Sequence, residues 1–136
     1  MDRYLVSALL TAALLAATAA PAPAQQVNKT VAAQSGAETM LSHERSWDDN
    51  CAARSSQVTI TRKPANGTVS VVSAQSTIPA STPRFGSTGK CAGKPVSGNQ
   101  VMYRSNPGFH GTDTVSYDVV YGAGKGGSST IVINVK

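Results

Sequence analysis

A two-residue alternation of apolar and polar side chains constrains the fold of this chain most strongly. Apolar residues recur at every second position from Val115 to Tyr121 and again from Ile131 to Val135. Successive side chains of a β-strand point to opposite faces, so this period is typical of strands that bury one face. The same alternation occurs in Gln57 to Arg62, in Thr68 to Val72, and at Val101 and Tyr103. We therefore expect strands at these positions, including Thr114 to Tyr121 and Thr130 to Val135.

Turn-forming residues separate the alternating segments. Proline, glycine and asparagine gather in four places, at Pro64 to Gly67, Pro83 to Gly89, Asn106 to Gly108 and Gly122 to Gly127. Short strands at such intervals, without a long helical pattern, indicate an all-β fold. We predict an immunoglobulin-like antiparallel β-sandwich of about seven strands, formed as one domain by residues 37–136.

The segment from Ala37 to Trp47 is the least decided part of this domain. Met40, Leu41, Glu44 and Trp47 have a spacing that also fits a helical turn. We favour a first strand followed by a loop.

The N-terminus has the pattern of an export signal. An arginine near the start is followed by an apolar run from Leu5 to Ala20, and Ala22-Pro23-Ala24 forms a small-residue cleavage site. A membrane-spanning helix needs about 20 apolar residues, and this run is shorter and ends in prolines. Residues 1–24 are therefore predicted to be a signal peptide, and residues 25–36 a flexible N-terminal lead. These features predict an exported protein, periplasmic or extracellular, without a transmembrane segment.

Cys51 and Cys91 are the only two cysteines. An exported pair is expected to form a disulfide, which would act as a structural staple. The spacing does not fit a Cys-x-x-Cys redox motif, and no metal ligand stands close to either residue.

Basic residues exceed acidic ones, giving a formal net charge of +5. No acidic residue occurs from Asn50 to Thr112, and an uneven positive field favours acidic partners. We expect a protein or an acidic polysaccharide of the cell envelope as partner. Nucleic acid is not expected, because few aromatic side chains are present for base stacking. The predicted partner-binding residues are those of one basic loop with a neighbour: Arg84, Lys90, Lys94 and Arg104.

The stretch from Asn106 to Val119 places a histidine, an aspartate and a tyrosine close together between two predicted strands. We interpret it as a structural corner. A buried tyrosine needs a hydrogen-bond partner, and Tyr117 is expected to bond upstream backbone. Asp113 is expected to accept hydrogen bonds from nearby backbone N–H groups.

The residues of this corner also carry a family resemblance. Tyr103, Asn106-Pro107, Gly108-Phe109, Gly111, Asp113, Tyr117 and Val119 resemble the signature of bacterial immunoglobulin-like and cadherin-like domains, which are common in secreted and cell-surface proteins. Pro64, Gly67, Val69 and Val71 are similar to the strand-turn-strand segment of the same domains. The resemblance implies a sandwich that binds or spaces other molecules and implies no catalysis.

The chain departs from this family pattern in two places. Tyr121-Gly122 stands where related adhesin repeats carry an Asp-Gly pair that helps to hold calcium, so calcium is not expected there. Val119 stands where antibody domains carry their second cysteine, so the Cys51–Cys91 bridge must lie elsewhere. It is expected to tie the first segment to the Pro83 to Lys94 loop.

Two chemical alternatives remain. A copper-binding or metal-handling protein could use His43 and His110 with Met40 and Met102, since imidazole and thioether groups suit copper. A hydrolase could use His110 beside Asp113, but no nucleophile stands in a recognisable local motif. We expect no enzyme activity and no cofactor.

Overall fold

The computed structural model describes residues 25–82, 86–122 and 124–136. The predicted signal peptide, residues 1–24, lies outside these ranges. The elements in chain order are β1 (Gln25–Ala33), β2 (Glu38–Trp47), β3 (Ala53–Arg54), β4 (Ser56–Arg62), β5 (Gly67–Thr77), β6 (Ser81–Thr82), β7 (Gly86–Ser87), the 3₁₀ turn η1 (Gly89–Cys91), β8 (Pro95–Ser105), β9 (Gly111–Tyr121) and β10 (Gly126–Val135). The predicted all-β class is therefore confirmed.

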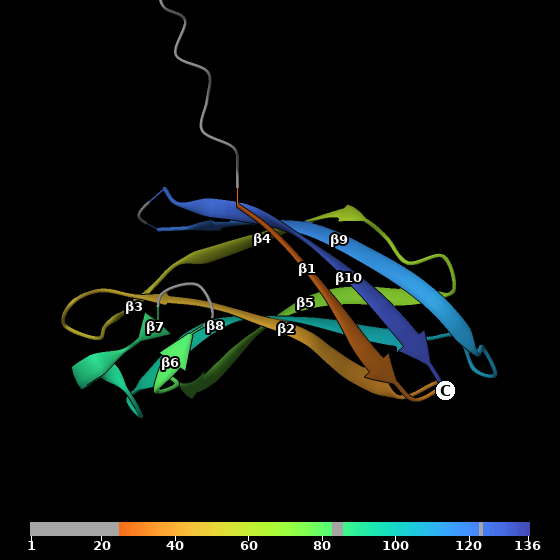
Figure 1. The fold of residues 1–136 in the computed structure, drawn as a ribbon, viewed down its shortest axis with the longest axis horizontal. Coiled ribbons are helices and arrows are strands. Elements are labelled where there is room, and N and C mark those ends of the chain that lie inside the picture. Colours follow the sequence, from red (N-terminus) through yellow and green to blue (C-terminus); the bar gives the residue numbers. More distant parts are fainter. Residues whose placement is uncertain (1–24, 83–85, 123) are drawn as a thin grey trace, which may run out of the picture.

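Two four-stranded sheets pack face to face (Figure 1). One has the strand order β1-β10-β9-β4 and the other β3-β2-β8-β5. β4, β9 and β10 share one sheet and β2, β5 and β8 share the other, as the corresponding strands of an immunoglobulin-like sandwich do. β1 differs from the constant-domain arrangement, because it pairs in parallel with β10 instead of joining the sheet of β2. A short hairpin of β6 and β7 lies outside the two sheets.

The core lies between the sheets and comes from the predicted alternation. In β9, the residues at positions 113, 115, 117 and 119 are buried, while those between them are more exposed. Ile131, Ile133 and Val135 of β10 bring the same pattern to the same layer. Val101 and Tyr103 of β8 are 0% and 1% exposed and close this layer from the other sheet. Burial of these side chains from both sheets holds the layers together.

The prediction of a flexible lead at residues 25–36 is wrong for most of that segment. Residues 25–33 form β1, which pairs in parallel with β10 along its whole length. Ala33 is 5% exposed and Val31 packs against the core. The segment was hard to identify because an edge strand gains most of its order from backbone hydrogen bonds to its neighbour, and these leave little trace in composition. Among the described residues the sandwich thus begins at Gln25.

The favoured strand in the segment Ala37 to Trp47 is confirmed as β2, which runs from Glu38 to Trp47, but it is the second strand and not the first, because β1 precedes it. Its alternation is broken by a bulge between Met40 and Ser42, where the register with β8 shifts. An extra residue in one strand changes which side chains face the core. This break explains why the sequence of the segment also fitted a helical turn.

A smaller apolar cluster forms around the disulfide. Cys51, Ile78, Cys91 and Val96 are buried together, and Trp47 packs against them. The Cys51–Cys91 bond joins the turn after β2 to η1, across a sequence separation of 40. The predicted disulfide and the predicted connection to the Pro83 to Lys94 loop are both confirmed.

Asp113 connects the two sheets at the other end of the molecule. It is 4% exposed, and its carboxylate accepts hydrogen bonds from the backbone N–H groups of Ala65, Asn66 and Thr114 at 2.8, 2.9 and 2.9 Å. The Tyr103 hydroxyl of β8 donates a fourth, at 3.0 Å. Asp113 is therefore a structural residue as predicted, but two of its backbone donors lie in the distant β4–β5 turn.

These hydrogen bonds shift the pKa values of Asp113 and Tyr103 in opposite directions. Burial alone would raise the pKa of Asp113, but the backbone donors of Ala65, Asn66 and Thr114 and the Tyr103 hydroxyl outweigh it, so this pKa lies below its ordinary value. Burial, together with the hydrogen bond to Asp113 and its charge, raises the pKa of Tyr103 to about 12.

Acid should therefore weaken the fold partly through Asp113. A carboxyl group whose pKa is lower in the folded state stabilises the fold above its unfolded pKa, near 3.8, and that stability is lost as pH falls through the folded pKa. Asp113→Asn should reduce the free energy of unfolding at neutral pH by about 1–3 kcal/mol, because an amide cannot accept all four bonds. In urea denaturation, the free energy of unfolding should also fall less on acidification for the variant than for the wild type. Equal acid sensitivity of the two proteins would contradict this role.

The disulfide should stabilise the sandwich without being needed for its topology. For a closed loop of this length the chain-entropy model gives about 4 kcal/mol. The double variant Cys51→Ser and Cys91→Ser should keep its far-ultraviolet circular dichroism, since the main core contains neither cysteine, and should unfold at lower urea concentration. An unchanged unfolding midpoint would show that the bridge does not restrict the unfolded chain.

Candidate functional site

The disulfide cluster positions Trp47 at one end of the sandwich. β2 ends at Trp47, and the chain then turns back at once: the Asp48 carboxylate accepts hydrogen bonds from the N–H groups of Asn50 and Ala52 at 2.9 and 3.0 Å. Cys51 follows with a positive φ of 66°, a backbone conformation that is uncommon for residues other than glycine. The bridge to Cys91 then holds η1 against this turn. Trp47 is thus fixed between the turn and η1.

A groove of about 770 Å³ lies beside Trp47. We call it the end groove, and its lining residues are Arg45, Ser46, Trp47, Asp48, Asp49, Arg54, Ser87, Thr88, Gly89, Lys90, Cys91, Tyr121 and Lys125. They come from the end of β2 and the turn after it, from β3, from the segment around η1, and from the β9–β10 hairpin. Loops from both sheets therefore meet in one concave site, as expected for a ligand pocket.

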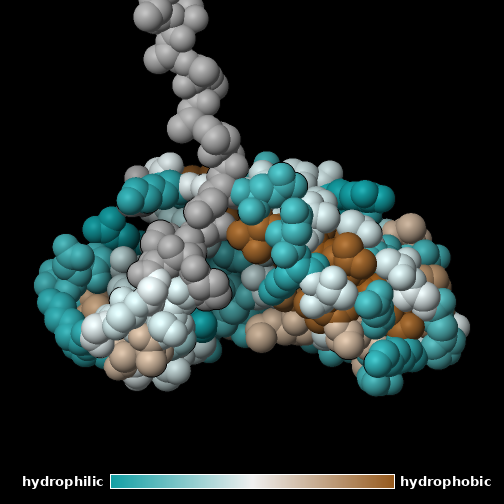
Figure 2. Space-filling view, viewed as in Figure 1, coloured by the Kyte–Doolittle hydropathy of each residue, from teal (hydrophilic) through white to brown (hydrophobic). Residues whose placement is uncertain are grey.

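Cations outnumber carboxylates in the end groove. Arg45, Arg54, Lys90 and Lys125 line it together with only Asp48 and Asp49, and one of these two carboxylates already accepts two backbone hydrogen bonds. Arg45 is held in place by a hydrogen bond of 2.8 Å from its guanidinium to the Ser76 hydroxyl. In Figure 2 hydrophilic residues line the outer margin of this end of the molecule, whereas apolar residues reach the surface over β1 and β10. Such an arrangement attracts anionic groups.

Glu44 anchors the second aromatic residue of the groove. Its carboxylate accepts hydrogen bonds from the hydroxyls of Ser42, Tyr117 and Tyr121 at 2.6, 2.5 and 2.6 Å. Since Glu44 lies in β2 and the two tyrosines in β9, these bonds cross from one sheet to the other. Tyr121 is therefore held by its hydroxyl and is one of the residues that line the end groove.

Tyr117 thus differs from its predicted role. It is 1% exposed in the middle of β9, and its hydroxyl donates to Glu44 instead of to upstream backbone. Burial raises the pKa of Tyr117 to about 12, and the hydrogen bond to Glu44 acts in the same direction. The residue secures the sandwich, but at the centre of the sheets and not at the corner.

A smaller groove of about 360 Å³ opens beside this carboxylate, between β1 and β2. Lys29 of β1 lines it with Glu44 and Tyr117. Burial lowers the pKa of Lys29, whereas the negative charge of Glu44 raises it. This groove shares Arg45, Trp47 and Tyr121 with the end groove, so the two are parts of one concave region.

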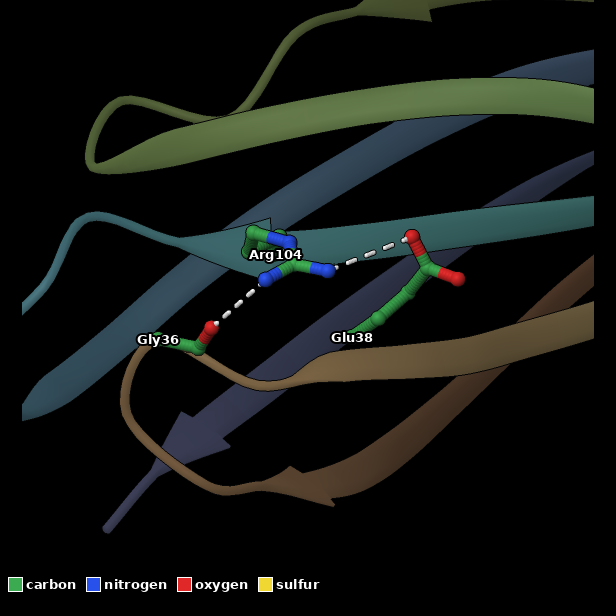
Figure 3. A network of polar contacts seen from close by, with 3 residues as sticks. All are labelled: Gly36, Glu38 and Arg104. Carbon is green, nitrogen blue, oxygen red and sulfur yellow. Dashed lines mark hydrogen bonds and ion pairs between the residues drawn. The ribbon is translucent and has the colours of Figure 1, made fainter.

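The predicted partner-binding residues do not form one patch. Lys90 lines the end groove, and Lys94 is exposed immediately before β8. Arg104 lies at the far end of β8, about 30 Å from Pro95 by the rise of a strand, so the expectation that it stands beside the basic loop is wrong. There Arg104 donates to the Gly36 carbonyl at 3.1 Å and lies 3.7 Å from the Glu38 carboxylate (Figure 3). Arg84 lies outside the described residues.

The residues of the alternative metal site are also dispersed. Met40 and Met102 face each other across β2 and β8. His43 pairs with Gln100, whereas His110 follows the far end of β8, more than about 15 Å along that strand. The Nε2 atom of His43 is buried without a hydrogen-bond partner, and burial followed by the charge of Arg45 lowers its pKa. Within the described ranges no group of three or more histidine, cysteine, aspartate or glutamate residues could hold a metal ion.

The hydrolytic alternative requires His110 and Asp113 to act together, and the structure gives them different surroundings. His110 is exposed in the loop between β8 and β9. The Asp113 carboxylate is buried and directed at Tyr103 and the β4–β5 turn. It is therefore committed to the fold.

Several groove residues were missed by sequence reasoning. Trp47 and Arg45 were placed only in a strand, and Lys125 only in a hairpin loop. A signal was available for Trp47: it is the single tryptophan and lies close to a cysteine of the predicted disulfide. Tyr121 and Arg54 gave no local signal, because they join the groove only through the packing of the two sheets.

Comparison with known proteins finds no matching family model, no similar curated protein and no similar solved structure. In the portion of the chain that the structure describes, there is no helix with the length and apolar character needed to cross a membrane.

The hydroxyl groups bound to the Glu44 carboxylate should contribute to the stability of the sandwich. Tyr117→Phe removes one of its hydroxyl donors and should lower the free energy of unfolding by about 1 kcal/mol. Ser42→Ala removes another donor to the same carboxylate and should lower the free energy of unfolding by a similar amount in urea denaturation. If Tyr117→Phe changed ligand affinity and left stability intact, the tyrosine would belong to the binding site itself.

Proposed function

We propose that this protein is an exported, non-catalytic binding module that takes an acidic polysaccharide of the cell envelope in the end groove. The observation that carries the proposal is the grouping of four cationic side chains around Trp47 and Tyr121 in one concave site. The cations would pair with carboxylate or sulfate groups, and the aromatic rings would pack against the sugar rings. The Cys51–Cys91 disulfide supports the export that this requires.

The position of the groove supports a binding role. It is formed by the connection between β2 and β4 and by the β9–β10 hairpin. The corresponding B–C and F–G loops of antibody variable domains bind antigen at the same end of the sandwich. This is an analogy of fold, and it agrees with the resemblance to bacterial immunoglobulin-like domains noted in the sequence. Membership in that family remains a proposal.

A polysaccharide fits the groove better than an acidic protein surface. The groove is concave, and Ser46 and Ser87 line it beside the charged residues, whereas the hydroxyl of Thr88 donates to the Pro79 carbonyl. A flexible polymer can follow such a channel and exchange hydrogen bonds with the hydroxyls of these two serines. A folded protein face would need a broader and flatter contact, since stable protein interfaces bury about 800 Å² on each partner.

Binding can be measured through the single tryptophan. Addition of polygalacturonate should change the fluorescence of Trp47, and the affinity should fall as salt is added, because ionic attraction is screened. Lys90→Glu should weaken the affinity by at least about tenfold. Lys63→Glu makes the same change of charge in the β4–β5 connection, outside the residues lining the groove, and should have little effect.

Two further ligands decide the class of partner. Dextran, a neutral polysaccharide, should not bind, and polyglutamate should bind more weakly than polygalacturonate. Preference for polyglutamate would favour an acidic protein as the partner. Equal weakening by Lys90→Glu and Lys63→Glu would show attraction to net charge alone, and the end groove would no longer be the site.

A further inference from the structure

Residues 78–82 and 86–94 belong to a lobe that joins the end of β5 to the start of β8. We call this segment the end lobe, and it contains β6, β7 and η1. At its base, the Ile78 N–H donates to the Lys94 carbonyl and the Gly93 N–H donates to the Ile78 carbonyl, both at 2.8 Å. Farther out, β6 pairs with β7. The lobe is therefore closed on itself by its own backbone hydrogen bonds.

The end lobe supplies one wall of the end groove. Of the residues that line the groove, those from Ser87 to Cys91 come from the lobe. The other wall comes from the sandwich, through the end of β2, the turn after it, β3 and the β9–β10 hairpin. In Figure 1, β6 and β7 lie at the same end of the molecule as β3. The shape of the groove thus depends on how the lobe is held against the sandwich.

The disulfide attaches the outer part of the lobe to the opposite wall. In the small apolar cluster, Ile78 and Val96 lie at the base of the lobe, next to β5 and within β8. Among the described members of this cluster, Cys91 alone comes from η1. Its bond to Cys51 ties η1 to the turn after β2. The apolar contacts therefore hold the base, and the bridge holds the wall that carries Lys90.

The charges of the groove oppose this closed arrangement. Lys90 lies in the end lobe, whereas the three other cations of the groove belong to the sandwich wall. Like charges repel each other, and the carboxylates of Asp48 and Asp49 offset only part of this repulsion. A covalent bond thus joins two walls that their cations push apart.

We propose that the Cys51–Cys91 disulfide positions Lys90 for ligand binding and makes the end groove sensitive to reduction. With the bridge intact, Lys90 and the sandwich cations act on one ligand. With the bridge reduced, the lobe moves about its base and Lys90 leaves the groove. The main core contains neither cysteine, so the sandwich itself keeps its fold. The effect on affinity rests on the proposed function, whereas the separation of the walls does not.

A dithiol is the class of reductant that this step requires. One of its thiolates attacks a sulfur of the bridge, forms a mixed disulfide and releases the first cysteine as a thiolate. Its second thiol then displaces the other cysteine, and the reductant leaves as a disulfide. Two electrons pass from the dithiol to the bridge, and its two protons end on the two cysteines.

Trp47 reports the separation of the walls without any ligand. It packs against the disulfide cluster and is the single tryptophan. Reduction by dithiothreitol should raise the acrylamide quenching constant of its fluorescence at least about twofold, because the lobe opens locally, with unchanged far-ultraviolet circular dichroism. Reoxidation should reverse the change. The double variant Cys51→Ser and Cys91→Ser should show the raised value without reductant. Unchanged quenching, with reduction verified by thiol titration, would overturn the proposal.

A double-mutant cycle tests the positioning of Lys90. In the wild type, Lys90→Glu should weaken polygalacturonate binding at least about tenfold. In the double cysteine variant the same substitution should weaken it by less than about twofold, because Lys90 has already left the ligand. Lys125→Glu is the matched control on the sandwich wall and should have the same effect in both backgrounds. An equal effect of Lys90→Glu in both backgrounds would overturn the proposal.

Asp113→Asn separates local positioning from a general loss of stability. It weakens the fold away from the groove and should keep the wild-type affinity for polygalacturonate. If this variant lost as much affinity as the double cysteine variant, the loss would come from stability alone and the proposal would fall. A wild type that does not bind polygalacturonate would contradict the proposed function, and acrylamide quenching would still decide whether the disulfide holds the walls together.

Discussion

The buried carboxylate of Asp113 is the interaction on which the packing of this sandwich depends. Burying an ion costs free energy unless hydrogen bonds replace the lost water. Here the β4–β5 turn, the backbone of β9 and the Tyr103 hydroxyl of the opposite sheet supply four such bonds. Removing any of these donors leaves charge unsatisfied in the core. The carboxylate therefore fixes the position of one sheet, one turn and one facing strand at the same time.

A second carboxylate links the two sheets nearer the disulfide end. Glu44 of β2 binds the hydroxyls of Tyr117 and Tyr121 of β9, so each sheet contributes one buried or half-buried carboxylate to the hydroxyl groups of the other. Between the two carboxylates lie the apolar layers of Val101, Val115 and Ile131. The polar contacts define how the sheets align, and the apolar layers supply the favourable burial.

The two ends of the sandwich have different physical characters. At the Asp113 end, Arg104 donates to the Gly36 carbonyl and lies close to the Glu38 carboxylate. At the disulfide end, cations from four separate segments line a concave site with only two carboxylates. Under the proposed binding function, a stable scaffold at one end would allow the loops of the other end to carry charges that suit a partner.

The sequence predicted those features that have a local cause. The alternation in β9 and β10 identified the core strands, and the two cysteines identified the disulfide. Both the two-residue period of apolar side chains and the tendency of two exported cysteines to form a disulfide can be recognised without knowledge of the fold. β1 escaped prediction because backbone pairing at an edge requires little apolar character. The partner of Tyr117 and the separation of Lys90 from Arg104 depend on how two sheets face each other. Such long-range packing is not encoded in the spacing of residues along the chain.

The division into a scaffold end and a binding end is the central claim, and a map of backbone amide shifts tests it most directly. Two-dimensional NMR spectra of the isotope-labelled protein would be recorded during addition of short oligogalacturonates. The account predicts that shifts concentrate at the Trp47 indole, at Gly89 and Lys90 and at Lys125, while the turns at residues 34–37 and 106–110 stay unchanged. Shifts at those turns, or changes spread evenly over both ends, would contradict it.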